Sequence, residues 1–237
     1  MKYYYDLHIH SALSPCGDND MTPNNIVNMA LIKGLDIIAV TDHNTCGNVR
    51  AVMAAAAGRL TVVPGLEVET AEEVHVVCYF PNIENAEAMS RAVQQHMPPV
   101  ANRPDIFGRQ YYMDAEDRVV GEEEILLVNA TTLHIGEVFR LVKGFGGVAV
   151  PAHIDRPSYS ILANLGMIPP DITVTAVEIT SRARGEMEKK YDKYKILTNS
   201  DAHYLEDIAE PDYQLPLLSK NAEETVKYLC TIEENIL

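Results

Sequence analysis

The chain has 237 residues, of which 47% are hydrophobic and 22% are charged, values that are ordinary for a globular domain with one sizeable core. Its 19 Lys and Arg residues and 34 Asp and Glu residues give a net charge of −15, which disfavours binding of a nucleic-acid polymer through a broad basic surface. No apolar run is long enough for a membrane span, and the first residues lack a signal-peptide pattern, so we expect a cytoplasmic protein without membrane contact.

Short apolar runs alternate with helical stretches along the chain. We predict strands at residues 3–7, 35–40, 60–63, 74–80, 147–150, 174–179 and 194–197. Helices are expected at residues 22–33, 47–57, 84–95, 135–143 and 221–234. Because strands that alternate with helices imply parallel βαβ units, the pattern predicts one α/β domain over residues 1–237, with a barrel rather than an open sheet.

Residues 98–121 interrupt this rhythm. The stretch contains three prolines and a polar turn at residues 114–118, and we interpret it as an insertion with a hairpin between residues 110–113 and 119–120. Such insertions often cover a substrate, although a plain surface loop is an equal alternative.

Metal-compatible side chains follow five of the predicted strands. They are His8 and His10, Asp42 and His43, Glu67, His153, and Asp201 and His203. Alternate residues of a strand face the same side, so His8 and His10 can reach one ion. Each motif alone is weak, but in a barrel all these strand ends meet on one face, where active sites are built. Mixed imidazole and carboxylate ligands favour zinc, manganese or iron over calcium or magnesium, and leave the choice among the first three open.

These motifs, in this order, resemble the PHP family, named for polymerase and histidinol phosphatase. The resemblance rests on His-x-His at residues 8–10, Thr-Asp-His at 41–43, Glu67, two further histidines and Asp-x-His at 201–203. It implies a distorted (β/α)7 TIM-like barrel that holds two or three divalent metals. By this resemblance, His8, His10, Glu67 and Asp201 would hold the first ion. Glu67 would bridge to a second ion bound by His75 and His153, and His43 and His203 would hold a third.

The loop after His10 departs from that pattern. The family usually has an Asp or His five or six residues after the second histidine, where this chain has Pro15 and Cys16. Asp18, Asp20 or Cys16 could take over as a ligand of the third ion; among the three we select Asp18.

Arginines and further acids near the ligands suggest roles in binding and catalysis. Arg156 is three residues beyond His153, and its planar fork suits phosphate oxygens, although a salt bridge, for instance to Asp155, is an equal alternative. Arg182 and Arg184 follow a predicted strand and are further candidates for phosphate contacts. Asp42 and Glu178 are expected to orient ligand histidines. The predicted catalytic residues are Asp42, Glu67 and Arg156. His134, at a helix start, is expected to have a capping or surface role.

The sequence thus predicts a metal-dependent phosphoesterase that hydrolyses a small phosphorylated metabolite or nucleotide with a metal-activated hydroxide. Three alternatives remain: a histidinol-phosphate phosphatase, a metal-dependent amide hydrolase with the same metal face, and a non-catalytic module stabilised by metal. The complete ligand set argues against the last, and the arginines favour phosphate over amide.

Overall fold

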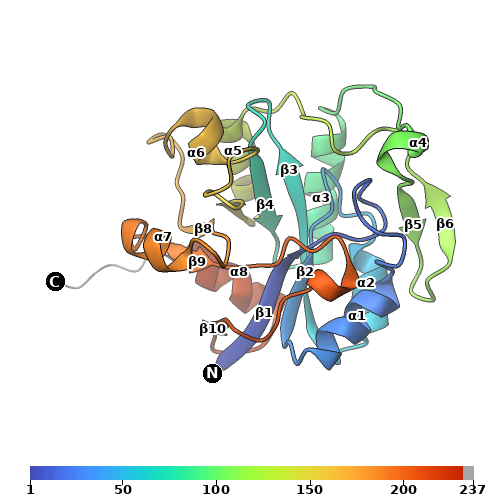
Figure 1. Cartoon of the computed structure of the whole chain (residues 1–237), viewed down its shortest axis with the longest axis horizontal. Helices are drawn as coiled ribbons and strands as arrows, with labels where there is room; N and C mark the ends of the chain where they lie inside the picture. The colour runs from blue at the N-terminus through green and yellow to red at the C-terminus, as the bar shows by residue number, and fades with distance from the viewer. Residues whose placement is uncertain (232–237) are drawn as a thin grey trace.

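A curled six-stranded sheet forms the centre of the computed structural model, which describes residues 1–231 (Figure 1). The strand order is β10-β1-β2-β3-β4-β7. These strands are β1 (Lys2–Ile9), β2 (Ile37–Val40), β3 (Thr61–Glu69), β4 (His75–Tyr79), β7 (Val148–Pro151) and β10 (Gln214–Pro216). β8 (Ala176–Glu178) and β9 (Lys195–Leu197) form a separate parallel pair that continues the curl next to β7.

The expected succession of parallel βαβ units is wrong at β4. β1, β2 and β3 are parallel as predicted, but β4 pairs antiparallel with both β3 and β7. The chain turns back directly between Glu69 and His75 without a crossover helix, which only an antiparallel pair allows. β10 is also antiparallel to β1. The described residues therefore form a mixed α/β half-barrel, consistent with a TIM-like fold, and the count of seven βα units remains a prediction.

Helices cover both faces of the sheet. α1 (Pro23–Ile32), α2 (Val49–Ala56), α3 (Ile83–Gln94) and α5 (Ile135–Gly144) pack against one face, in a core cluster that includes Ile26, Met89 and Ile38. α8 (Ala222–Cys230) closes the other face, where Val226 and Leu229 contact side chains such as Leu7. Because the strands are buried on both faces, they are continuous apolar runs in the sequence.

The remaining helices are short: α4 (Pro104–Phe107), α6 (Ile161–Leu165), α7 (Arg184–Lys190) and the 3-10 turn η1 (Leu205–Asp207). The predicted C-terminal helix has its last residues, 232–234, outside the described part of the chain. None of the helices among residues 1–231 is both long and apolar enough to cross a membrane.

The segment predicted as an insertion contains the expected hairpin. β5 (Tyr111–Met113) pairs antiparallel with β6 (Val119–Glu122). The hairpin packs on the loops that follow β1 and β2, since the Tyr111 amide donates to the Ala12 carbonyl and the Met113 amide to Asn48 Oδ1, both at 2.9 Å. The hairpin therefore supports the two loops that carry part of the candidate site.

Candidate metal centre

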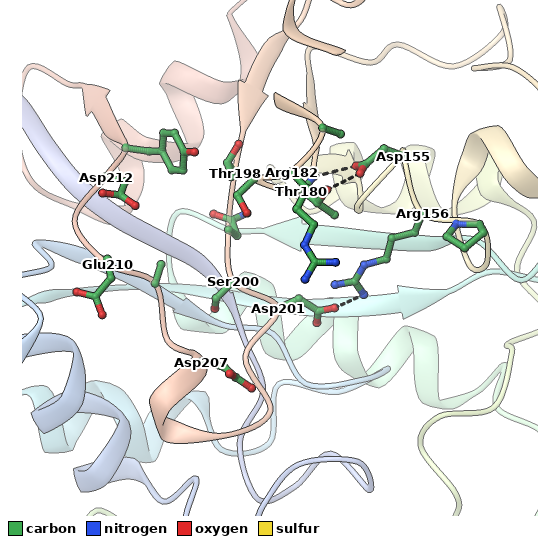
Figure 2. Close-up of a pocket in the computed structure, with 16 residues that line it drawn as sticks. Asp155, Arg156, Thr180, Arg182, Thr198, Ser200, Asp201, Asp207, Glu210 and Asp212 are labelled. Carbon is green, nitrogen blue, oxygen red and sulfur yellow. Dashed lines mark hydrogen bonds and ion pairs between the residues drawn. The ribbon is translucent and has the colours of Figure 1, made fainter. Parts of the chain in front are cut away.

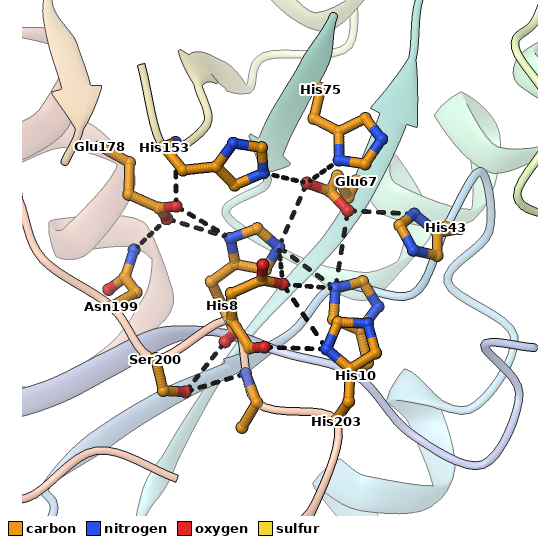
Figure 3. Close-up of polar contacts among 12 residues, drawn as sticks. His8, His10, His43, Glu67, His75, His153, Glu178, Asn199, Ser200 and His203 are labelled. Atoms are coloured by element: carbon orange, nitrogen blue, oxygen red, sulfur yellow. Dashed lines mark hydrogen bonds and ion pairs between the residues drawn. The ribbon is translucent and has the colours of Figure 1, made fainter. Parts of the chain in front are cut away.

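Eight of the nine predicted metal ligands converge at one edge of the sheet (Figure 3). They are His8, His10, His43, Glu67, His75, His153, Asp201 and His203. Most follow the carboxyl ends of strands, as expected, but His8 lies inside β1 and Glu67 inside β3, and both strands are longer than predicted. His75 is the first residue of β4. Because β4 is antiparallel to β3, its first residue lies at the edge where its neighbours end.

Glu67 lies at the centre of this cluster. Its side chain is fully buried, and five imidazole nitrogens approach its two oxygens. The nitrogen–oxygen distances are 3.0 Å for His43 and His75, 3.3 Å for His8, 3.5 Å for His10 and 3.6 Å for His153. Neither oxygen has a hydrogen-bond partner among the described residues. A buried carboxylate without hydrogen bonds is costly, and cations between it and the imidazoles would remove that cost. The donor set therefore fits divalent metals.

His8 of β1 and His10, the residue just after that strand, both direct Nε2 into the cluster. His8 Nδ1 lies 3.0 Å from Glu178 Oε2, and His10 Nδ1 lies 2.9 Å from Ser14 Oγ. Carboxylate oxygens only accept, so Nδ1 of His8 carries a hydrogen and its Nε2 faces Asp201 Oδ1 at 3.3 Å. This is the arrangement of a metal-binding histidine whose other ring nitrogen is held by a neighbouring acid.

Glu178 and Asp42 differ in how they reach these histidines. Glu178 contacts His8 directly and also accepts a hydrogen bond from the His153 amide at 3.1 Å. Asp42 instead accepts from Ser14 Oγ at 2.7 Å, and Ser14 in turn faces His10. Asp42 thus positions His10 through Ser14 rather than by direct contact. No feature of the sequence singled out Ser14, because a serine four residues after a histidine is an ordinary loop residue.

The pKa values of the ligands reflect this crowding. Burial opposes the charged form of His8, but Glu178, Asp201 and Glu67 outweigh it and raise the His8 pKa well above its usual value. Burial and the nearby His203 and His43 lower the pKa of His10 far below its usual value, so its Nε2 lone pair is available. Protons on histidines such as His8 therefore balance part of the negative charge of the buried carboxylates. Bound metal ions would displace these protons.

The loops that carry His153 and Asp201 are held in backbone conformations that L residues rarely adopt. Their φ angles are 29° and 54°. Tyr159, which the sequence did not suggest, also has a positive φ of 54°, and its ring stacks on His75 with 4.9 Å between centroids. Such strain persists only where the surroundings determine the conformation, and it is often found at functional sites.

Arg156 and Arg182 project into a pocket of about 1020 Å³ beside the cluster (Figure 2). Arg156 Nη1 lies 2.5 Å from Asp201 Oδ2, so Arg156 pairs with a candidate ligand rather than with Asp155. The Asp155 carboxylate instead accepts hydrogen bonds from the amide and the hydroxyl of Thr180. Arg182 is exposed and forms no ion pair within residues 1–231.

Arg184 lies outside this pocket. Its guanidinium stacks on the Tyr213 ring at 4.2 Å from the centroid and donates to Thr198 Oγ1 at 2.8 Å. Arg184 therefore packs α7 against the rest of the chain, and we leave it out of the candidate phosphate contacts. His134, as expected, has a capping position, since its amide donates to Glu137 Oε2 at 2.9 Å at the start of α5.

Of the residues considered for the third ion, Cys16 lies next to His43 and His203. Burial would raise the Cys16 pKa, but the two histidines outweigh it and lower this pKa to about 6. The Asp18 carboxylate instead accepts from the Asp20 amide at 2.8 Å within its own loop. Neither Asp18 nor Cys16 belongs to any of the ligand clusters within the described residues.

Comparison with known proteins agrees with this picture. The PHP domain profile matches residues 6–232, which is nearly the whole chain. No curated protein sequence matches closely enough to be counted. Among solved structures, the lesion-specific endonuclease EndoQ of Pyrococcus furiosus is similar, with a TM-score of 0.72 and 19% identity over 97% of this chain. The match covers 56% of that endonuclease.

A protein of Bifidobacterium adolescentis with a provisional assignment as a metal-dependent phosphoesterase has a TM-score of 0.58 and 20% identity, over 95% of both chains. At 19% and 20% identity, these two structures support the fold of this chain and say nothing of its activity.

Proposed function

Because the chain belongs to the PHP family, we propose that it is a metal-dependent hydrolase of phosphate esters, with a small phosphorylated metabolite or nucleotide as its substrate. The observation that carries this proposal is the fully buried Glu67, which lies among five imidazoles without a hydrogen-bond partner inside the described chain. Divalent cations would satisfy all of these donors together.

The residues divide among two or three ion positions. His8, His10, Glu67 and Asp201 would hold one ion, Glu67 with His75 and His153 a second, and His43 with His203 a third. Zinc, manganese or iron bound there would lower the pKa of water and neutralise charge on the phosphoryl oxygens.

The protein's own side chains would orient the reaction. Glu178 and Ser14 fix the rings of His8 and His10, so that each Nε2 points inward. Arg156 and Arg182 line the adjoining pocket, where their guanidinium groups would bind the non-bridging oxygens of a phosphate. An amide substrate carries no such charge, which is why the arginines favour phosphate over a carbonyl substrate.

The size and charge of the pocket favour a small substrate. Its far wall carries the carboxylates of Asp207, Glu210 and Asp212, which would repel the backbone of a polyanion (Figure 2). DNA is nevertheless a second candidate, because the similar EndoQ has been crystallised with a 27-mer duplex that carries an abasic lesion. We favour the small phosphoester because this wall is acidic and the net charge is −15.

A substrate panel tests the proposal. The purified protein, loaded separately with manganese, iron or zinc, would be assayed for release of inorganic phosphate from phosphomonoesters and nucleotides, histidinol phosphate among them. Duplex DNA with an abasic site and a set of cyclic amides complete the panel. We expect turnover of at least one phosphomonoester. Cleavage of the DNA alone would replace the small substrate with a polymer, and hydrolysis of amides alone would overturn the phosphoesterase function.

A further inference from the structure

Glu69 and His75 lie directly opposite each other on two strands that a tight turn connects. β3 ends at Glu69 and β4 begins at His75, and the two residues are Cα partners in the antiparallel pair. Residues that face each other in such a pair have neighbouring side chains. Glu67 lies two residues before Glu69 in the same strand, so both carboxylates face the same side of the sheet. The register of β3 and β4 therefore places the His75 ring beside both acids.

The two nitrogens of the His75 ring face different carboxylates. Nδ1 lies 3.0 Å from Glu67 Oε1, at the centre of the candidate metal cluster, and Nε2 lies 3.6 Å from Glu69 Oε2. Both Nε2 and Glu69 Oε2 are buried, and neither has a hydrogen-bond partner among the residues that the structure describes. Buried polar atoms without partners are costly. Because their separation is only about half an ångström longer than a hydrogen bond, a small shift of either side chain satisfies both atoms.

Neighbouring loops hold the backbone of both residues. The Glu69 amide donates to Asn44 Oδ1 at 3.0 Å, and the Glu69 carbonyl accepts from the amide and the hydroxyl of Thr131, each at 2.9 Å. The His75 amide donates to the Tyr159 carbonyl at 3.0 Å, and the Tyr159 ring stacks on the imidazole. Three loops thus fix the places from which the Glu69 carboxylate and the His75 ring approach each other.

We propose that Glu69 is a positioning residue for His75: its carboxylate accepts a hydrogen bond from Nε2, so that His75 binds the second cation of the proposed centre through Nδ1. The inference rests on the metal centre of the proposed function. A neutral imidazole has one nitrogen that carries a hydrogen and one that offers a lone pair. Since Nδ1 faces Glu67 and the cluster, the lone pair is needed there. The hydrogen then lies on Nε2, where Glu69 Oε2 is the acceptor.

The consequence is that His75 uses the opposite ring nitrogen from His8 and His10. The groups that support His8 and His10 contact Nδ1 and leave Nε2 for a cation. Glu69 instead contacts Nε2 of His75 and leaves Nδ1. A carboxylate on the far nitrogen fixes the ring and makes the imidazole a more basic ligand. Glu69 should therefore strengthen binding at the second position without contacting the ion.

Two-bond hydrogen–nitrogen NMR correlations show which nitrogen of His75 binds the metal. The histidines would be labelled with nitrogen-15, and the protein would be loaded with zinc, which is diamagnetic. The His75 signals would be assigned by their nuclear Overhauser contacts with the Tyr159 ring, which stacks on this imidazole. We expect the hydrogen on Nε2 of His75 and the metal on Nδ1, and the opposite pattern for His8 and His10. If His75 binds zinc through Nε2, Glu69 does not hold its ring and the inference is wrong.

The zinc affinity of Glu69 variants gives a second readout. Glu69→Leu removes the acceptor and should weaken the binding of one zinc ion about 10- to 100-fold, the usual effect of losing a group that supports a ligand. Glu69→Gln keeps an amide oxygen that can accept from Nε2, and should recover most of that loss. Glu73→Gln changes an exposed acid in the same turn and is the control, which should bind zinc like the wild type.

The outcomes separate this inference from the proposed function. If Glu69→Leu binds zinc as tightly as the wild type, the Glu69 carboxylate does not support His75. If Glu69→Gln binds no better than Glu69→Leu, the carboxylate is itself a ligand of the ion. Either result overturns the inference and leaves the metal centre standing, whereas a wild type that binds no zinc overturns both. The NMR measurement needs no variant, so it decides the question even if Glu69→Leu does not fold.

Discussion

Glu67 differs from the other buried carboxylates in how its oxygens are satisfied. Asp6 accepts hydrogen bonds from the amide and hydroxyl of Ser200, and Asp42 accepts from the amide and hydroxyl of Ser11. Both acids therefore have protein donors for their oxygens. Glu67 is equally buried, but within residues 1–231 its carboxylate oxygens have imidazole nitrogens as their polar neighbours and no hydrogen-bond donor. Burial would raise its pKa, yet His75 and His8 outweigh burial and hold the Glu67 pKa well below its usual range. An ionised Glu67 is what a bridging ligand requires.

The substitution Glu67→Gln tests this role. The amide removes one negative charge and one anionic oxygen from the centre, with little change in volume. We expect metal affinity to fall by more than the roughly 10- to 100-fold typical of residues that only support a ligand, and turnover to fall with it. Metal content would be measured by elemental analysis, and circular dichroism would check that the fold is intact.

Glu69→Gln is the matched comparison. Glu69 Oε2 lies 3.6 Å from His75 Nε2 and also lacks a hydrogen-bond partner within residues 1–231. If Glu67→Gln keeps wild-type turnover and full metal content while Glu69→Gln loses both, the bridging ligand is Glu69.

Arg156 is the residue that separates phosphate from amide substrates. If it binds a non-bridging oxygen, Arg156→Ala removes a charge-assisted hydrogen bond worth about 1.5–3 kcal/mol, or about 10- to 150-fold in kcat/KM. Arg156→Lys should recover only part, since an ammonium cannot form the two-pronged contact. Inhibition by inorganic phosphate should weaken in parallel, as measured in steady-state assays.

Arg184→Ala is the control for Arg156, because Arg184 does not line the pocket itself and packs against Tyr213, one of its wall residues. It should leave phosphate inhibition unchanged. The phosphate role of Arg156 is refuted if Arg156→Ala hydrolyses a phosphomonoester like the wild type with the same phosphate inhibition; Arg182 would then be tested in the same way.

At the scale of elements, the β5–β6 hairpin stabilises the loops of the site through Asn48. This buried amide donates to the Tyr111 carbonyl at 2.9 Å and to Ser11 Oγ at 3.0 Å, and accepts from the Met113 amide at 2.9 Å. Asn48→Ala leaves these partners unpaired, which should cost about 1–3 kcal/mol and lower Tm. Amide exchange in the hairpin should accelerate, as measured by hydrogen–deuterium exchange.

Asn102→Ala in the same segment is the control for Asn48, because the half-buried Asn102 side chain donates one hydrogen bond, to the Gly108 carbonyl, and its Oδ1 has no partner within residues 1–231. We expect little change in Tm from it. Unchanged exchange of the hairpin in Asn48→Ala would show that the hairpin packs independently of this residue.

The elements also show what the sequence could predict and what it could not. Thr22 and Pro23 correctly predicted the start of α1, where Thr22 Oγ1 accepts from the Asn25 amide. The direction of β4 was not predictable from its apolar run, because strands buried on both faces look the same in either direction. The extension of β3 through Glu67 was missed because Gly65 suggests a turn, whereas here it allows the backbone to approach Cys78.

The candidate site likewise has a part that the sequence could predict and a part that it could not. Histidines and acids at strand ends could be found from their spacing, together with the family resemblance. The roles of Ser14, Tyr159 and Arg184 depend on which loops meet in three dimensions, and spacing carries no such information. The position of the Asp18 carboxylate likewise depends on the fold of one loop, in which it accepts a hydrogen bond from the Asp20 amide at 2.8 Å. The limits of the insertion and the location in the cytoplasm stay predictions.

At the scale of the whole molecule, the acidity has two parts. Most of the net charge of −15 lies on exposed side chains, where water solvates it. Glu67, Glu178 and Asp201 instead concentrate negative charge at the edge of the sheet, within 3.6 Å of histidine nitrogens. Bound cations would neutralise this buried charge and link the loops after β1, β2, β7 and β9. The centre should therefore contribute to folding stability as well as to chemistry.

The metal content of the protein as purified tests the central claim most directly. Elemental analysis by mass spectrometry, normalised to protein concentration, should find about two or three transition-metal ions per chain, since the ligands form three overlapping groups, one with Glu67, one with Asp201 and one of histidines alone. Less than about half an equivalent of metal, with no phosphoesterase activity restored by manganese, iron or zinc, would contradict the assignment of this cluster as a metal centre.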